Sequence, residues 1–246
     1  MGSREPRVFV TAEWRYLAML NYAVDPASLA PFVPAGTELD FFEGRTFVSL
    51  VAFRFLQTRV LGVSVPFHAD FEEVNLRFYV RRRAAEGWRR GVTFIRELVP
   101  RRAVALVARL VFNENYIAIP MSHQIADVGL GAERRLCAEY GWRHRGTTGS
   151  IRMRAGGTPV RPQTGSLEQF ITEHYWGYVR QRAGGTLEYE VRHDPWGVWA
   201  SDEAAFVDEG SGLFDPALSS ALGRKPDSAF LADGSPVRLF EGRRIA

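Results

Sequence analysis

The sequence contains one lysine and one cysteine, and each scarcity excludes a class of chemistry. Of the 31 lysine and arginine residues in this chain of 246, only Lys225 is a lysine. Schiff-base catalysis needs a primary amine, and a guanidinium cannot replace it because it stays protonated. Lys225 lies in a polar, turn-like stretch, so we expect it to be exposed and expect no imine chemistry. The single Cys137 excludes an intramolecular disulfide and any cysteine-based metal cluster.

Other absences narrow the function further. No run of 18 uncharged apolar residues is present, and the N-terminal residues lack the pattern of a signal peptide. We therefore expect a soluble cytoplasmic protein with no membrane partner. The five histidines have no metal-motif spacing, and there is no nucleophile elbow, Walker loop or dinucleotide-binding glycine pattern. We expect neither a metal nor a cofactor, although a metal site assembled from distant residues stays open.

The charged residues are numerous but balanced. The net charge is only +3, and the arginine pairs are interleaved with acids. A nucleic-acid-binding surface would need a concentrated basic stripe, so we expect no nucleic-acid partner. With 46% hydrophobic residues the composition is that of a globular protein. No linker pattern divides the chain, so we expect a single domain over 1–246, with the tail 210–246 unassigned.

The middle of the chain gives the clearest structural signals. Residues 73–80 alternate, with Val74, Leu76, Phe78 and Val80 on one face of a predicted strand. Residues 92–99 form the returning strand of a hairpin. The spacing of apolar residues over 100–112 predicts a helix. A second helix is predicted over 166–180, where Ser166 and Gln169 form a capping box, and a short one over 202–207. The region 122–149 has no clear pattern.

The opposite face of the alternating strand carries Glu73, Asn75 and Arg77. In an open sheet this face would meet water, whereas in a closed barrel it would line a cavity. A buried glutamate beside an arginine would there form an acid–base pair or a fork for carboxylates. Arg54 and Arg96 lie in otherwise apolar strands, which is costly unless each is paired. Each could anchor an acidic ligand or serve as a structural ion-pair partner.

Several segments together resemble the YqjF-like family of uncharacterised proteins. The resemblance covers about residues 14–200 and is carried by segments 20–40, 42–51, 71–80, 91–94 and 191–196. That family is similar in fold to acetoacetate decarboxylase. The resemblance implies an α+β domain built on a curled, mainly antiparallel β-sheet, a cone-shaped barrel flanked by helices, with a pocket inside.

The same resemblance places a candidate site. In the decarboxylase a strand glutamate precedes a helix, and the turn after that helix carries the imine lysine. Glu73 resembles that acid, but the turn here is Asn113-Glu114-Asn115-Tyr116 and contains no lysine. The resemblance therefore implies the pocket without the decarboxylation route. Glu73 is the candidate acid/base, and the candidate ligand-binding residues are Asn75, Arg96, Asn115, Tyr116 and Arg54.

Three functions stay open on the sequence alone. The leading hypothesis is a pocket for a small organic acid or carbonyl compound. The second is a lysine-independent lyase or hydrolase that uses Glu73, and the third is an arginine-rich interaction scaffold without a ligand. The sequence also leaves open a homo-oligomer.

Overall fold

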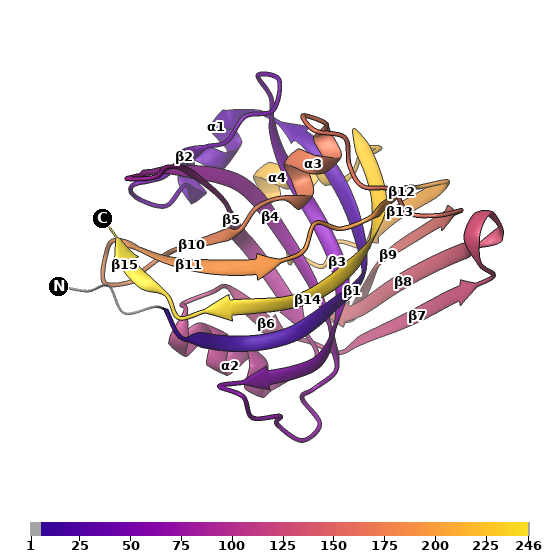
Figure 1. Ribbon diagram of the computed structural model, residues 1–246, viewed down its shortest axis with the longest axis horizontal. Coiled ribbons are helices and arrows are strands. Elements are labelled where there is room, and N and C mark those ends of the chain that lie inside the picture. The colour runs from indigo at the N-terminus through magenta and orange to yellow at the C-terminus, as the bar shows by residue number, and fades with distance from the viewer. Residues whose placement is uncertain (1–5, 246) are drawn as a thin grey trace.

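The computed structural model describes residues 6–245, and its main body is a strongly curled sheet of 11 strands (Figure 1). Long β-branched and aromatic runs favour these strands, several of which exceed 12 residues. The strands are β1 (Val8–Val24), β2 (Glu38–Leu39), β3 (Thr46–Val60), β4 (Phe71–Ala84), β5 (Gly87–Val99), β6 (Tyr116–Ala118), β10 (Trp176–Arg180), β11 (Thr186–His193), β12 (Val198–Ala200), β14 (Ser228–Phe240) and β15 (Arg243–Ile245).

The order of the strands brings the two ends of the chain together. The main path runs β12-β14-β1-β3-β4-β5-β10-β11-β15, with β2 beside β4 and β6 beside β5. β14 also pairs with β11, so the strands return on themselves. Neighbours are antiparallel except β5 with β10 and β5 with β6. The prediction of a curled, mainly antiparallel sheet is confirmed, and the helices beside it are few and short.

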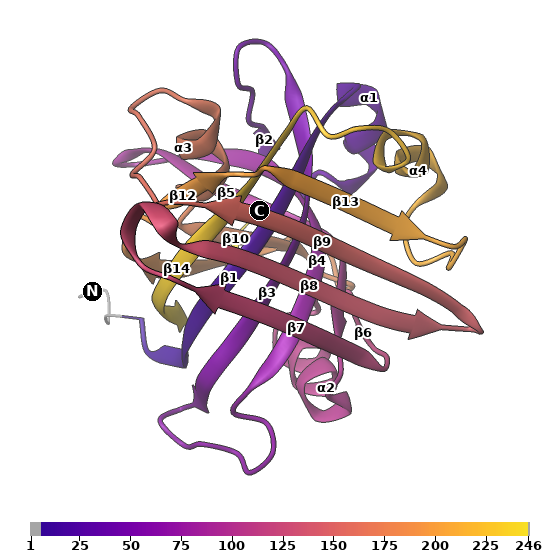
Figure 2. The same cartoon turned by 90° about the vertical axis from the view of Figure 1, so that its right-hand side faces the viewer.

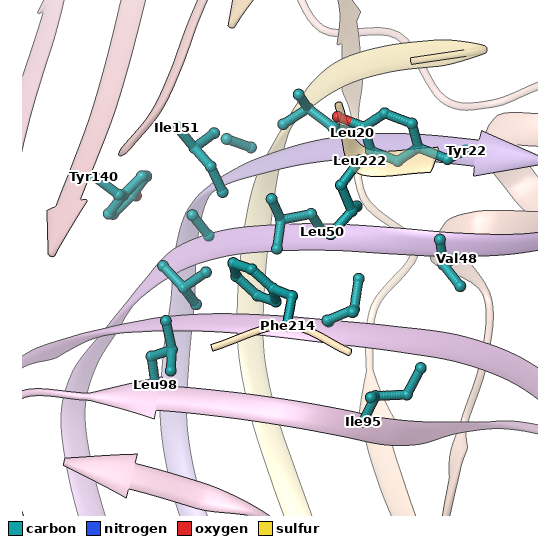
Figure 3. Packing of buried hydrophobic residues seen from close by; sticks show 14 of the residues in the cluster. Leu20, Tyr22, Val48, Leu50, Ile95, Leu98, Tyr140, Ile151, Phe214 and Leu222 are labelled. Atoms are coloured by element: carbon teal, nitrogen blue, oxygen red, sulfur yellow. The ribbon is translucent and has the colours of Figure 1, made fainter. Parts of the chain in front are cut away.

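A second sheet of four antiparallel strands packs across the outside of the first (Figure 2). Its order is β13-β9-β8-β7, with bounds β7 (Met121–Val128), β8 (Arg135–His144), β9 (Thr147–Gly156) and β13 (Glu203–Asp208). A large apolar cluster fills the space between the sheets, and Figure 3 shows Leu20 and Leu50 of the large sheet on the side of Ile151 of the second. The region 122–149, which showed no pattern in sequence, thus forms most of a covering sheet.

The helices are short, and side-chain caps begin three of them. They are α1 (Pro26–Leu29), η1 (Ala30–Phe32), α2 (Arg102–Val111), η2 (Gly131–Glu133), α3 (Leu167–Thr172) and α4 (Pro216–Leu222). Asp25, Ser166 and Asp215 accept backbone N–H groups at the starts of α1, α3 and α4. Among residues 6–245, no helix has the length and apolar character needed to cross a membrane.

Two predicted helices differ from the structure. The predicted helix over 100–112 is confirmed as α2, but the one over 166–180 is wrong beyond Thr172. Glu173 leaves the helical region of the backbone, and residues 176–180 join the sheet as β10 beside β5. The predicted helix over 202–207 is also wrong, because Glu203–Asp208 pair with β9. In both places tertiary pairing overrides the local pattern.

The strand β3 is buried on both faces, as its apolar run predicts. One face supports the cluster between the sheets, and the other belongs to a second apolar cluster on the concave side, with Phe47, Val51 and Phe53. The curl of the sheet encloses this second cluster. The concave side therefore holds the protein's interior cavity.

Candidate functional site

A cavity of about 250 Å³ lies on the concave side of the large sheet. Its walls are mostly aromatic and aliphatic, as is usual for sites that bind small molecules. The aromatic walls include Trp14, Phe53, Phe55, Phe71, Phe94, Trp176, Tyr189 and Trp196. A small set of polar side chains interrupts them: Thr58, His68, Glu73, Asn75, Arg77, Glu97, Glu114, Tyr116, Thr172, His174 and His193.

The cavity reaches the surface between α2 and the β3–β4 connection. Three of its lining residues are exposed: Val65 on that connection, and Ala103 and Val107 on α2. α2 follows β5 directly and buries only Ala105 fully. The helix therefore forms one side of the cavity mouth, while the connection from 61 to 70 forms the other.

The alternating strand β4 supplies the polar centre of the site. Glu73, Asn75 and Arg77 are all less than a tenth exposed and line the cavity. Their neighbours Val74, Leu76 and Phe78 face the apolar cluster between the sheets. One face of this strand thus lies against the covering sheet, and the charged face lies against the cavity.

Glu73 is almost completely buried and accepts two hydrogen bonds. The Asn75 amide donates to Oε1 at 3.0 Å, and the Tyr116 hydroxyl donates to Oε2 at 2.8 Å. Burial raises the pKa of Glu73 to about 7, although these bonds and the nearby Arg77 favour its ionised form. Glu73 therefore exchanges a proton near neutral pH, which suits a general acid or base.

Two more buried carboxyl groups lie beside Glu73. Glu114 accepts a hydrogen bond from the Tyr189 hydroxyl at 2.9 Å, and burial raises the pKa of Glu114 to about 8. Burial, and then the neighbouring Glu114 and Glu73, raise the pKa of Glu97 well above its usual range. Oε2 of Glu97 has no partner among the described residues. Near neutral pH the cluster therefore holds protons that it can donate to a polar ligand.

A β-bulge in β5 decides which side chain faces the cavity. Leu76 lies opposite Arg96, but the next residue, Arg77, lies opposite Phe94, so Ile95 is extra. The extra residue changes the alternation, because side chains on a strand alternate between faces. Glu97 therefore faces the cavity opposite Asn75, and Arg96 faces the other side.

The remaining predicted ligand-binding residues lie apart from the cavity wall. Arg96 donates to the Leu213 carbonyl at 2.9 Å and to Asn115 Oδ1 at 3.0 Å. Asn115 also donates to the Ile95 carbonyl, so both residues tie the α2–β6 turn to β5. Arg54 contacts His123, which contacts Glu72, on the side of the covering sheet. Of the predicted set, the structure brings Glu73, Asn75 and Tyr116 together.

Arg77 and His174 add polar atoms without partners. Arg77 donates to the Ile171 carbonyl at 3.4 Å, while its Nε has no partner among the described residues. Burial lowers the pKa of His174 to about 4, although Asp40 opposes this change. Its ring lies 4.6 Å from that of Tyr79, its Nε2 lies 3.6 Å from Oδ2 of Asp40, and its Nδ1 has no hydrogen-bond partner among the described residues. His174 is thus neutral near pH 7, and Nδ1 is the ring nitrogen left to bind a ligand.

Comparison with known proteins assigns the family. The model of the DUF2071 family, described as uncharacterized conserved proteins (COG2071), matches residues 11–236. The chain belongs to the DUF2071 family. It is 28% identical over 188 residues to "Uncharacterized protein YqjF" of Bacillus subtilis (strain 168), covering 74% of this chain and 72% of that protein. The predicted resemblance to YqjF-like proteins is confirmed.

Solved structures support the fold of this DUF2071 protein. An acetoacetate decarboxylase from Legionella pneumophila superposes with a TM-score of 0.64 at 14% identity, covering 100% of this chain and 92% of that one. The enduracididine biosynthesis enzyme MppR, complexed with pyruvate, gives 0.66 at 12% identity, with coverage of 100% and 93%. The acetoacetate decarboxylase-like fold is therefore confirmed.

Sequence reasoning missed two members of the DUF2071 protein's acid cluster. Glu97 lies in the returning strand, and the bulge that turns it inward leaves no mark in the residue pattern. Glu114 lies in the turn after α2, which the resemblance did point to. Within residues 6–245, no group of three or more His, Cys, Asp or Glu side chains is placed to hold a metal ion. Lys225 is exposed and lies outside the cavity lining.

Proposed function

We propose that this protein binds a small carbonyl compound or organic acid in the concave cavity and that Glu73 transfers a proton to or from it. The observation that carries the proposal is Glu73 itself: a 3%-exposed carboxyl group on the cavity wall, held by Asn75 and Tyr116. Its pKa of about 7 allows it to act as acid and base at neutral pH.

The donors around Glu73 fit a carbonyl oxygen. Protonated carboxyl groups at Glu97 and Glu114 and the free Nε of Arg77 all lie on the cavity wall. Hydrogen-bond donors aimed at one oxygen stabilise the charge that develops when the adjacent carbon loses a proton. In this arrangement Glu73 takes the proton from carbon, and the donors stabilise the resulting enolate oxygen.

The proposed chemistry uses no imine. The only lysine, Lys225, is exposed on the α4–β14 connection, away from the cavity lining. The superposed enzyme MppR is described in complex with pyruvate, which supports small carbonyl acids as the first compounds to test. A cytoplasmic location belongs to the same proposal.

A cavity of this size favours ligand binding over an interaction scaffold with a filled interior. A ligand-binding protein and an enzyme would both use this cavity, and only the enzyme would transfer a proton. One experiment therefore separates them.

The test follows binding and proton transfer separately. Binding of pyruvate, acetoacetate and a neutral methyl ketone is measured by quenching of Trp14, Trp176 and Trp196, which line the cavity. Proton transfer is measured by NMR as deuterium incorporation next to the carbonyl in heavy water. We expect Glu73→Gln to abolish exchange and to change affinity less than threefold.

Two outcomes contradict the proposal. Equal loss of binding and exchange in Glu73→Gln would make Glu73 a ligand anchor or a structural residue. Borohydride reduction that traps a covalent adduct with acetoacetate or pyruvate would show an imine route. The exposed Glu133→Gln is the matched control and should alter neither readout.

A further inference from the structure

The exposed large hydrophobic side chains gather around the cavity mouth. Fourteen such side chains are exposed among the described residues, and eight of them lie in just two segments. We call these eight the apolar rim: Leu61, Val63, Val65 and Phe67 on the β3–β4 connection, and Leu106, Val107, Leu110 and Val111 on α2. Contiguous exposed apolar patches usually mark an interaction site.

The two halves of the apolar rim lie side by side. Figures 1 and 2 both show the β3–β4 connection next to α2 at one end of the molecule. Val65 and Val107 each also line the cavity. The rim therefore surrounds the mouth of the cavity, with Phe67 (88% exposed) and Leu110 (76%) as its most exposed members.

The β3–β4 connection is held in place rather than hanging free. Leu61 N–H donates to the Phe9 carbonyl, and Val60 and Val63 bond each other in both directions at 2.9 Å. At the far end His68 N–H donates to the Val65 carbonyl at 3.0 Å. Phe67 itself has a φ of 61°, a left-handed conformation that is costly for a bulky residue. The fold thus presents an aromatic ring to the outside at a conformational cost.

Positive charge accompanies the apolar rim. The segments 57–70 and 99–112 contain Arg59, Arg101, Arg102 and Arg109 and one acidic residue, Asp70. They carry a net charge of +3, which equals the net charge of the whole chain, so the rest of the protein is neutral overall. Arg59, Arg101 and Arg102 are exposed; Arg109 is exposed too and donates to the Tyr116 carbonyl. The partner of this surface should be apolar and carry negative charge.

We propose that the apolar rim docks the protein onto the surface of an anionic lipid bilayer, with the cavity mouth facing the lipid. An amphipathic helix with arginines at its polar margin is suited to the headgroup region. Side chains that project from two separate segments fit a fluid layer that closes around them. This is binding at the membrane surface. It departs from the expectation of no membrane partner, which rested on the lack of a long apolar run in the sequence.

A second copy of the chain is a poorer partner. In a symmetric dimer the same patch meets itself, so four arginines would face four arginines. Anionic headgroups would instead neutralise them. Docking also gives a reason for the position of the rim, because a hydrophobic ligand could pass between the lipid and the aromatic cavity without crossing water.

The test is sedimentation with lipid vesicles. We expect the protein to pellet with vesicles of phosphatidylcholine mixed with phosphatidylglycerol, less with pure phosphatidylcholine, and less again at high salt. The double variant Phe67→Ser/Leu110→Ser should lower the partition coefficient for vesicles by roughly tenfold or more, because two exposed apolar side chains are lost. Arg101→Gln/Arg102→Gln should lower it on anionic vesicles alone.

Matched controls keep the test decisive. Leu130 is also 88% exposed but lies on the β7–β8 connection, and Arg161 and Arg182 are exposed elsewhere. Leu130→Ser and Arg161→Gln/Arg182→Gln should bind vesicles like the unchanged protein, and an unchanged melting temperature shows that each variant folds. Absence of pelleting with anionic vesicles overturns the proposal. The proposal is also overturned if Leu130→Ser loses as much vesicle binding as the double variant Phe67→Ser/Leu110→Ser. A dimer that forms without lipid and that Leu110→Ser dissociates would overturn it as well.

Discussion

The hydroxyl of Tyr116, on the short strand after α2, donates a 2.8 Å hydrogen bond to Oε2 of Glu73 in the middle of β4. This bond joins the helix at the cavity mouth to the proposed acid/base at the cavity wall. Because it favours the ionised carboxylate, it holds the pKa of Glu73 near 7 against the effect of burial.

Removal of this hydroxyl should make Glu73 a weaker acid. A hydrogen bond to a charged group contributes about 1.5 kcal/mol or more, so Tyr116→Phe should raise the pKa of Glu73 by about one. The measurement is NMR titration of carbon-13-labelled glutamate side chains. Tyr175→Phe is the control, since Tyr175 contacts His193. An unchanged or lowered pKa in Tyr116→Phe would contradict the assignment of this bond.

The raised pKa of Glu114 should appear as a loss of stability at alkaline pH. Because its pKa is about 8 in the folded protein and 4.5 in an ordinary environment, the folded state binds more protons between these values. The free energy of unfolding therefore falls as pH rises from 4.5 through 8. Glu114→Gln should remove roughly 4 kcal/mol of the decrease between pH 5 and pH 9.

Urea denaturation at the two pH values measures this effect. His174 contributes in the opposite direction below pH 6.5, because its pKa is lowered to about 4, but it does so equally in both proteins. The exposed Glu133→Gln serves as the control. An identical pH dependence in Glu114→Gln and the unchanged protein would refute the raised pKa.

Substitution of Arg96 should affect stability, whereas substitution of Arg77 should affect ligand binding. Arg96 holds the Leu213 carbonyl and Asn115 outside the cavity, so Arg96→Leu should lower the free energy of unfolding by about 1–3 kcal/mol and leave ligand affinity unchanged. Arg77→Leu should weaken binding of carbonyl acids at least tenfold, because Arg77 lines the cavity. Denaturation measures stability, and tryptophan quenching measures affinity. If Arg96→Leu weakened binding and Arg77→Leu only lowered stability, the bulge assigned to Ile95 would be wrong.

Gly177 should be essential for the position of Tyr189. A Cβ at Gly177 would lie 2.1 Å from Cζ of Tyr189, whose hydroxyl donates to Glu114. Gly177→Ala should therefore displace this ring, lower stability by about 1–3 kcal/mol and raise the pKa of Glu114 further. At Gly223 the nearest atom to a Cβ is 3.4 Å away, so Gly223→Ala is the control. A melting temperature equal in both variants would speak against the close packing of β10 on β11.

The sequence predicted the elements whose side chains carry a clean period. The alternation around Asn75 located β4 and its polar face, and the apolar stripe before Phe112 located α2. What it could not predict depends on non-local pairing. Ile95 forms a bulge only against Leu76 and Arg77 of the neighbouring strand. Because of that bulge, Glu97 faces the cavity and Arg96 faces the other side. Residues 176–180 leave the helical pattern because Gly91 leaves room for β10 beside β5 and Gly177 leaves room for Tyr189 of β11.

The placement of β14 has a consequence for how the protein is made. This strand, from the last part of the chain, pairs with β1 from the first, so Leu20 lies opposite Ala229. As a nascent chain leaves the ribosome, one edge of β1 stays without its neighbour until residues 228–240 emerge. Exposed strand edges invite wrong pairing. We expect folding to be slow, because the β1–β14 pairing joins residues far apart in the sequence and can form only after the final strand is made.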